Sequence, residues 1–524
     1  MQKRFVGFLI LFIAAAVLFS SCAVQTKEEV DLSKVVDVDQ LNGLTLPISK
    51  KNQKLTILTE SVKTNQNDSV ILEALRKITG LNLQIIPVKL ANVEQTLQTM
   101  IASKQLPDIF YCFIDQQTKQ VLANNKTIAP VDQYLSIMPN YKKLVIEDPE
   151  NYTLIKNSAL ADGHIYQIDT YGISRNINHC FMYRKDIFEK HGLKPWTNTQ
   201  EFYETLKELK RLYPDSVPFT IKLKDFVMNY LRPQWGIVNS DFVQNPETGQ
   251  WEYGNTSFAM KELMSFLVRL HREELLDQDF LTISDTSWMT RLASEDQAFV
   301  TFDWVDRLDM VTETMRAQGS DYELAMGYPI GLSGKYKNKT TFTNGGAYAI
   351  ANNANTEYSM KLMDFLISNE GAKFSTLGIE GVTFSYEDEA KEKVSYIGFE
   401  GNENINIQDL EERYGLFIPA IAIRFDSRSA YFQYTKRVAI AQEQVMEHHL
   451  LTEKLPYFEI SPLDKKMYED TKFKIDLAFN NFFPKFFAEN HRFEELWNQW
   501  LSEAKGMNSD FLNQVIQASP VSFY

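Results

Sequence analysis

The chain has 524 residues, of which 44% are hydrophobic and 23% are charged. This is the composition of a globular protein, and the length allows two or three compact lobes. The formal net charge is −14 and Lys and Arg form no cluster, so we expect no nucleic-acid partner.

The N-terminus reads as a secretory signal. Lys3 and Arg4 precede the apolar run "FVGFLILFIAAAVLF" at 5–19, which ends at Ser20 and Ser21. A transmembrane helix needs about 20 apolar residues, and this run is shorter. We therefore predict a signal peptide over 1–21.

The next residue, Cys22, predicts a lipid anchor. The stretch "FSSC" at 19–22 resembles the lipobox of bacterial lipoproteins, although Phe19 replaces the usual Leu. The resemblance implies that Cys22 receives a diacylglycerol and becomes the mature N-terminus. Two acyl chains anchor a protein stably, so we predict a lipidated N-terminus and polar tether over 22–52. The protein would lie at the extracytoplasmic face of the cell membrane.

The remaining cysteines are Cys112 and Cys180. They could pair in an oxidising exterior, but a chain of this length can be stable without a disulfide. We favour two unpaired thiols.

The first third of the chain alternates between strands and helices. Hydrophobic periodicity predicts strands at 54–60, 81–88 and 106–115, and helices at 68–80 and 92–105. Asp68 or Ser69 would cap the first helix and Gly80 would end it. This order predicts a doubly wound α/β lobe, whose ligand edge would hold the loops at 60–67 and 111–115.

The rest of the chain contains further elements of both kinds. A strand-like segment is expected at 179–192, and Asn198 with Glu201 has the spacing of a capping box at the start of a helix. The remaining predictions are a helix at 258–276, a buried strand at 297–308, a strand and helix at 344–368, and a helix at 492–506. Charge rises over 386–430, which we interpret as an insertion.

Several stretches, taken together, resemble one family. They are "ASKQLPDIF" at 102–110, "DGHIYQI" at 162–168, "YRKDIFEKHGLKPWTNTQEFYETLKELK" at 183–210, "YSMKLMDFLISNEGAKFSTLGIEG" at 358–381 and "LWNQWLSEAKGMNSDFLNQVIQ" at 496–517. In this order, behind a lipobox, they resemble the extracellular solute-binding lipoproteins of bacterial ABC importers, in the maltose-binding-protein-like cluster that serves mainly carbohydrates.

The resemblance implies a type II periplasmic-binding-protein-like fold, with two α/β lobes that close on a ligand about a hinge. We expect an N-lobe of 53–168 plus 341–385 and a C-lobe of 169–340 plus 386–524. Closure would exclude water and present a changed surface to a membrane partner.

The resemblance also suggests ligand-binding residues. It places "FDW" where the family keeps an aromatic platform with a polar neighbour, so Trp304 and Asp303 are the first candidates, with a core tryptophan as the alternative. Asp115, with Phe113 and Tyr111, ends the third strand, where an aspartate can accept sugar hydroxyls or cap the next segment.

Three further aromatic residues are weaker candidates. Tyr171 lies near the predicted crossing between lobes, and Trp288 and Trp235 are expected in loops of the C-lobe. For each, simple packing is the alternative.

No enzyme motif is present. We find no HExxH, GxSxG or P-loop pattern, so we expect no catalytic residue, metal site or cofactor. We predict a monomer that binds an oligosaccharide, held to the membrane by its anchor and serving ABC permease subunits. A surface-anchored glycan hydrolase or lyase is the alternative, because carboxylate pairs cannot be seen in sequence; a signalling or adhesion lipoprotein is a third reading.

Overall fold

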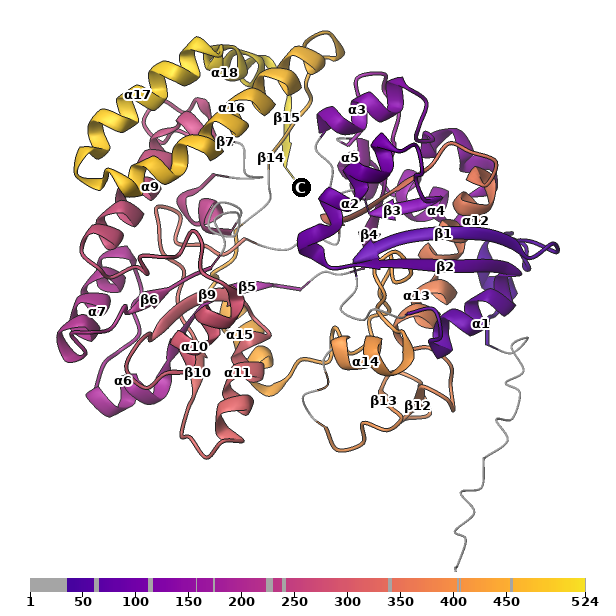
Figure 1. The fold of residues 1–524 in the computed structure, drawn as a ribbon, viewed down its shortest axis with the longest axis horizontal. Helices are drawn as coiled ribbons and strands as arrows, with labels where there is room; N and C mark the ends of the chain where they lie inside the picture. The colour runs from indigo at the N-terminus through magenta and orange to yellow at the C-terminus, as the bar shows by residue number, and fades with distance from the viewer. Residues whose placement is uncertain are drawn as a thin grey trace, which may run out of the picture.

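The protein forms two lobes side by side, each a sheet flanked by helices (Figure 1). The computed structural model describes residues 35–60, 66–111, 116–156, 158–172, 175–222, 230–237, 242–337, 342–402, 405, 407–452 and 456–523. The predicted two-lobed α/β fold is confirmed. Cys22, Cys112, Phe113 and Asp115 lie outside the described residues.

The N-lobe is built on a five-stranded sheet in the order β2-β1-β3-β11-β4. Strands β1, β2 and β3 run parallel, whereas β11 runs antiparallel to β3 and to β4. The strands are β1 Gln53–Glu60, β2 Leu81–Val88, β3 Ile109–Tyr111, β4 Ile168–Tyr171 and β11 Phe342–Ile350. Both faces of the sheet are buried, because Leu55 and Ile57 point into one core and Leu58 into another.

Helices cover both faces of this sheet. Helix α1 begins at Ser69, whose hydroxyl accepts from the backbone N–H of Leu72, and it ends at Gly80 in the left-handed conformation. The helices of the lobe are α1 Val70–Thr79, α2 Leu90–Ala102, α3 Gln116–Asn124, α4 Pro139–Tyr141, α5 Pro149–Lys156, α12 Thr356–Ile367, α13 Asn369–Thr376 and α14 Ile407–Tyr414. Short 3-10 or π turns are η2 Val38–Leu41, η3 Val131–Ile137 and η4 Lys142–Ile146.

Two of the expected boundaries of the N-lobe are wrong. The expected tether reached residue 52, but Val36, Leu41 and Leu44 are buried in the N-lobe core. The segment 386–430 was assigned to the C-lobe, yet the hairpin of β12 Phe384–Tyr386 and β13 Val394–Tyr396 and the helix α14 pack on the N-lobe core. In both cases scattered apolar residues within a polar segment supply the contact, and sequence periodicity does not register such contacts.

The C-lobe is built on a four-stranded sheet in the order β10-β5-β9-β6. Its strands are β5 His179–Arg184, β6 Phe219–Thr220, β9 Val300–Trp304 and β10 Leu324–Met326. Strand β9 pairs antiparallel with β5 and parallel with β6. Cys180 in β5 is a fully buried free thiol.

Helices enclose this second sheet. The predicted helix at 492–506 is confirmed as α17, with Phe493, Leu496, Trp497 and Trp500 buried. The helices are α6 Lys185–His191, α7 Thr199–Leu212, α9 Phe258–Arg272, α10 Asp285–Ala293, α11 Arg307–Arg316, α15 Lys436–Glu447, α16 Pro462–Ala488, α17 Phe493–Gly506 and α18 Ser509–Ala518. The 3-10 turns are η5 Arg232–Trp235, η6 Gly254–Thr256 and η7 Asn490–Arg492, and the hairpins are β7 Phe242–Gln244 with β8 Trp251–Tyr253 and β14 Pro456–Phe458 with β15 Val521–Phe523.

The lobes are joined by crossing segments that contact one another. After β4, the backbone of Tyr171 exchanges hydrogen bonds with Ile423 and Phe425. Beyond it, the Arg175 guanidinium donates to the backbone carbonyl of Tyr431 and lies 3.8 Å from the centroid of its ring. The first and last crossings are therefore held side by side.

Within the described ranges, the helices are too short or too polar to cross a membrane.

Candidate functional site

The C-lobe sheet turns one edge toward the N-lobe. Strand β5 is the first strand after the crossing from β4, so its first residue, His179, lies at the interlobe edge. The register pairs His179 with Trp304, which brings the carboxyl ends of β9 and of parallel β6 to the same edge. Ligands of α/β proteins bind beyond this edge of a sheet.

Trp304 is an exposed aromatic surface at this edge. All seven tryptophans lie in the described residues, and among them only Trp304 belongs to the exposed class, at 40%. The ring centroid of Trp304 lies 4.2 Å from that of His179, and His179 in turn lies 3.7 Å from Tyr230. His179 is 6% exposed, so it backs an aromatic surface whose exposed face is that of Trp304, and such a face is suited to stacking on the apolar face of a sugar ring.

Asp303 holds the backbone of Trp304 in place. Its side chain is fully buried, and its Oδ1 accepts a hydrogen bond of 2.7 Å from the backbone N–H of Trp304. The Lys222 Nζ lies 3.4 Å from Asp303 Oδ2 and 2.8 Å from Asp285 Oδ1. Burial raises the pKa of Asp303, while the Lys222 ammonium opposes that rise. Asp303 therefore positions the Trp304 backbone and has no exposed oxygen to offer a ligand.

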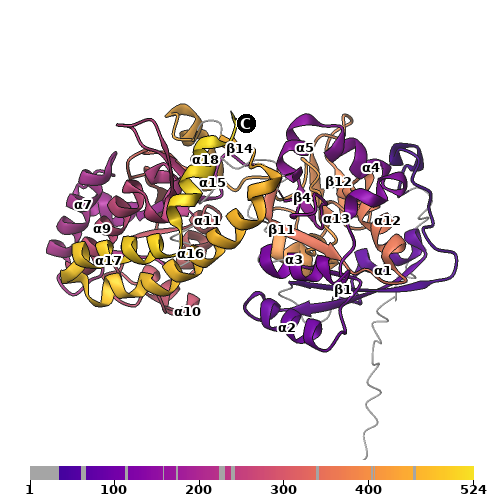
Figure 2. The ribbon, with the colours of Figure 1, turned by 90° about the horizontal axis from the view of Figure 1, so that it is seen from above.

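The carboxyl ends of the parallel strands in the N-lobe sheet face the C-lobe. Helix α2, which follows β2, lies on the side of the N-lobe that faces the C-lobe in both views (Figures 1 and 2). Because β1 and β3 are parallel to β2, their last residues, Glu60 and Tyr111, lie at this edge as well. The Tyr111 ring packs against Tyr348, with centroids 5.5 Å apart.

The remaining sequence candidates are buried. Tyr171 ends β4 and is 2% exposed. Trp288 lies in helix α10, where its Nε1 donates to Thr301 Oγ1 at 3.0 Å, and Trp235 lies in η5 against Phe266. Neither tryptophan is in a loop, so that expectation is wrong, and both contribute to the C-lobe core.

Sequence reasoning did not single out His179, Tyr230, Lys222 or Glu60. Glu60 opened a loop that the strand order had already placed at the ligand edge. His179 could not be found in the same way, because only the pairing of β5 with β9 brings it to Trp304.

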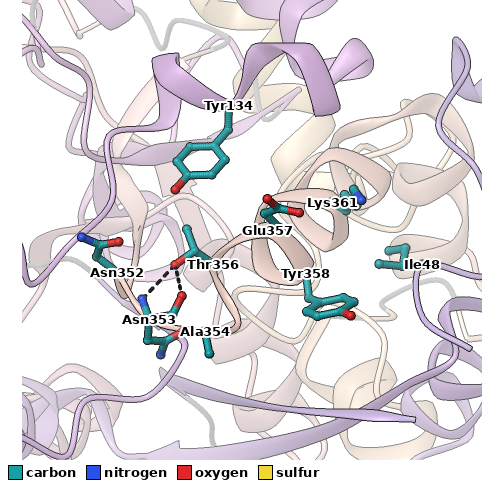
Figure 3. A pocket seen from close by; sticks show the side chains of 9 residues that line it. All are labelled: Ile48, Tyr134, Asn352, Asn353, Ala354, Thr356, Glu357, Tyr358 and Lys361. Carbon is teal, nitrogen blue, oxygen red and sulfur yellow. Dashed lines mark hydrogen bonds between the residues drawn. The ribbon is translucent and has the colours of Figure 1, made fainter. Parts of the chain in front are cut away.

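A cavity of about 370 Å³ lies elsewhere in the N-lobe (Figure 3). It is lined by Ile48, Tyr134, Asn352, Asn353, Ala354, Thr356, Glu357, Tyr358 and Lys361. These residues include the loop after β11, which is antiparallel to β3, so the cavity lies at the opposite edge from Glu60 and Tyr111. We therefore do not assign it to the interlobe site.

In the part of the chain that the structure describes, no three His, Cys, Asp or Glu side chains lie close enough together to hold a metal ion.

Comparison with known proteins agrees with this geometry. The model of the family described as bacterial extracellular solute-binding protein matches residues 71–391. Lipoprotein LipO of Bacillus subtilis (strain 168) is 23% identical over 422 residues, covering 76% of this chain and 80% of LipO.

Solved structures share the fold at low sequence identity. An alginate-binding protein, AlgQ2, superposes with a TM-score of 0.73 at 18% identity, covering 90% of this chain and 98% of its own. The Streptococcus pneumoniae ABC-transporter substrate-binding protein FusA, an EF-hand mutant in complex with fructo-nystose, gives 0.67 at 19% identity over 89% and 98%. An HMO-binding protein associated with an ABC transporter of Bifidobacterium longum infantis gives 0.66 at 14% identity over 89% and 98%.

A two-lobed α/β fold with an aromatic surface at the interlobe edge, matched by the family model over more than half of its length, places this chain in the family of bacterial extracellular solute-binding proteins.

Proposed function

We propose that this protein is the lipid-anchored binding component of an ABC importer, which captures an oligosaccharide between its lobes and delivers it to a membrane permease. The observation that carries the proposal is Trp304. Its partly exposed ring stands at the interlobe edge beside His179 and Tyr230, where the apolar face of a sugar ring can stack on it. The structurally similar AlgQ2, FusA and HMO-binding proteins are named for carbohydrate ligands.

Thermal unfolding of the soluble chain, begun after Cys22, tests ligand capture against a panel of oligosaccharides, peptides and small polar solutes. A ligand at a hundred times its Kd adds ~2.7 kcal/mol to stability, which raises Tm by several degrees. We expect a rise with an oligosaccharide. Rises with peptides alone would overturn the carbohydrate assignment.

Trp304→Ala is expected to abolish this rise, whereas Trp304→Phe retains part of it because a stacking ring remains. The free energy of unfolding without ligand should change by about 1 kcal/mol or less, since the side chain is partly exposed. Phe523→Ala is the matched control: Phe523 is 52% exposed in β15, and its removal should leave ligand binding unchanged.

We expect the protein to release its bound sugar chemically unchanged. Mass spectrometry of the ligand after long incubation with the protein checks this. Cleaved or unsaturated products would favour a hydrolase or lyase.

The lipid anchor is supported by the lipobox at Cys22 and by the similarity to Lipoprotein LipO. Labelling of cells with a radioactive fatty acid should mark the wild-type protein and leave the Cys22→Ser variant unlabelled. The variant should also leave the membrane fraction. An unlabelled wild-type protein would contradict the anchor.

A further inference from the structure

The N-lobe edge carries a carboxylate, that of Glu60, beside which no described residue places a counter-ion. Glu60 ends β1, the central strand of the parallel group, and is partly buried. Among the described residues none donates a hydrogen bond to its carboxylate, and none forms an ion pair with it. Burial raises the pKa of Glu60, and the rings of Tyr111 and Tyr348 lie beside it.

Glu60 can therefore act only as an acceptor toward a ligand when it is ionised. Burial likewise raises the pKa values of Tyr111 and Tyr348, and the nearby Glu60 charge adds to that effect. Both phenols therefore stay protonated and neutral. Because Tyr111 and Tyr348 are 5% and 2% exposed, they form a neutral wall behind Glu60, and of these three side chains Glu60 alone is partly exposed to a ligand.

Lys222 and Arg307, near the opposite edge, each lie beside the buried carboxylate of Asp303. Lys222 is 7% exposed and is shared between Asp285 and Asp303. The Arg307 Nε lies 3.6 Å from Asp303 Oδ1.

At the adjoining crossing, the Arg175 Nη1 lies 3.1 and 2.9 Å from the two oxygens of Asp306, and its Nε donates to the carbonyl of Tyr431. A carboxylate or sulfate on a sugar would therefore compete with Asp285 and Asp303 for Lys222, and with Asp306 for Arg175.

We infer that the interlobe site selects uncharged glycans over uronic-acid or sulfated ones, and that Glu60 is the residue that sets this selection. The inference rests on the proposed function. The hydroxyls of a neutral sugar can donate to Glu60 while its apolar face stacks on Trp304. An anionic sugar at the same place would bring two negative charges together in a site partly removed from water, which is unfavourable.

Ring-matched pairs of sugars test the selection by isothermal titration calorimetry on the soluble chain. Mannotriose against trimannuronate, and galactotriose against trigalacturonate, differ within each pair only in the oxidation of C6. Further neutral and sulfated oligosaccharides, from the panel used for thermal unfolding, are titrated alongside these pairs. We expect binding only among neutral sugars, with any anionic counterpart at least tenfold weaker.

Glu60→Gln keeps the shape of the side chain and removes its charge. In this variant the preference for the neutral sugar, measured as the anionic Kd divided by the neutral Kd, should fall by about tenfold or more. The matched control is Glu357→Gln: Glu357 is an exposed glutamate of the same lobe, at the opposite edge of the sheet (Figure 3), and its change should leave the ratio as in the parent.

The outcomes separate the two proposals. Tighter binding of the anionic member of a pair, or a ratio that does not respond to Glu60→Gln, overturns the selection while the carbohydrate function stands. Absence of binding by any sugar overturns both.

Discussion

At the scale of single residues, burial divides chemically similar side chains into different roles. Trp288 and Trp304 were both candidates for ligand contact in the sequence, yet Trp288 is 1% exposed and Trp304 is 40% exposed. Asp169 differs in the same way from carboxylates on the surface, because its side chain is removed from water. It is fully buried in β4, its Oδ1 accepts from Gln167 Nε2 at 2.9 Å, and burial raises its pKa to about 7.

Asp169 should make stability depend on pH. An aspartate in the unfolded chain ionises near pH ~4, so between about pH 4 and 7 the folded state binds more protons than the unfolded state. The free energy of unfolding therefore falls as pH rises through this window. Asp169→Asn removes the effect: the variant should be more stable than the parent at pH 8, by about 4 kcal/mol for a difference of about three pKa units, and the difference should vanish near pH 4.

Urea denaturation of both proteins at pH 4, 6 and 8 measures this difference. Lys119 attracts the ionised form of Asp169 and so keeps its pKa from rising further. A variant less stable than its parent at pH 8 would show that this attraction outweighs the cost of burial.

At the scale of elements, the contacts between crossing segments matter more than any one helix or strand. Arg175 joins the first crossing to the last through the Tyr431 carbonyl and ring, and joins both to Asp306 at the start of α11. Its side chain is 6% exposed. Asp306 lies two residues after Trp304, so the hinge contact and the aromatic surface belong to the same short stretch of chain.

Arg175→Ala should loosen the hinge. It leaves the Tyr431 carbonyl without its guanidinium donor, which should cost about 1–3 kcal/mol in the free energy of unfolding. Arg175→Lys should recover little, because an ammonium cannot reproduce the planar bidentate contact.

Urea denaturation gives the free energies, and Arg492→Ala is the control. Arg492 pairs with Glu489 and Glu495 on the exposed surface of the C-lobe, where an ion pair contributes about 0–1 kcal/mol. Equal losses for Arg175→Ala and Arg492→Ala would contradict the role assigned to the hinge contact.

At the scale of the whole molecule, the lobes also meet away from the crossings. Helix α16 contacts α3, the Lys465 Nζ donates to the Ala159 carbonyl at 2.6 Å, and Lys156 pairs with Glu459 at 3.1 Å. These contacts are few and polar, and such interfaces permit relative motion of domains.

Ligand binding should therefore change the arrangement of the lobes. We expect the radius of gyration from small-angle X-ray scattering to fall when a saturating oligosaccharide is added, because a ligand held by both edges favours the closed form. Trp304→Ala under the same conditions should show no change. An unchanged radius of gyration with calorimetrically confirmed saturation would contradict closure.

Local signals in the sequence were enough to locate most elements of the fold. Strand β2 at 81–88, the Ser69 cap and Gly80 stop of α1, and the buried face of α17 follow from periodicity and capping, which depend on neighbouring residues only. Strand β9 lies within the strand predicted at 297–308.

The sequence by itself determined the order of strands and helices, the two-lobed fold class and the family, because these depend on local patterns and on motifs that remain recognisable in linear order. Tertiary structure decided the site. The pairing of β5 with β9 places His179 beside Trp304, burial turns Asp303 into a support and Trp235 into core, and apolar residues of 386–431 join the N-lobe. Each of these depends on which distant residues come into contact, and contact between distant residues leaves no periodic trace in the chain.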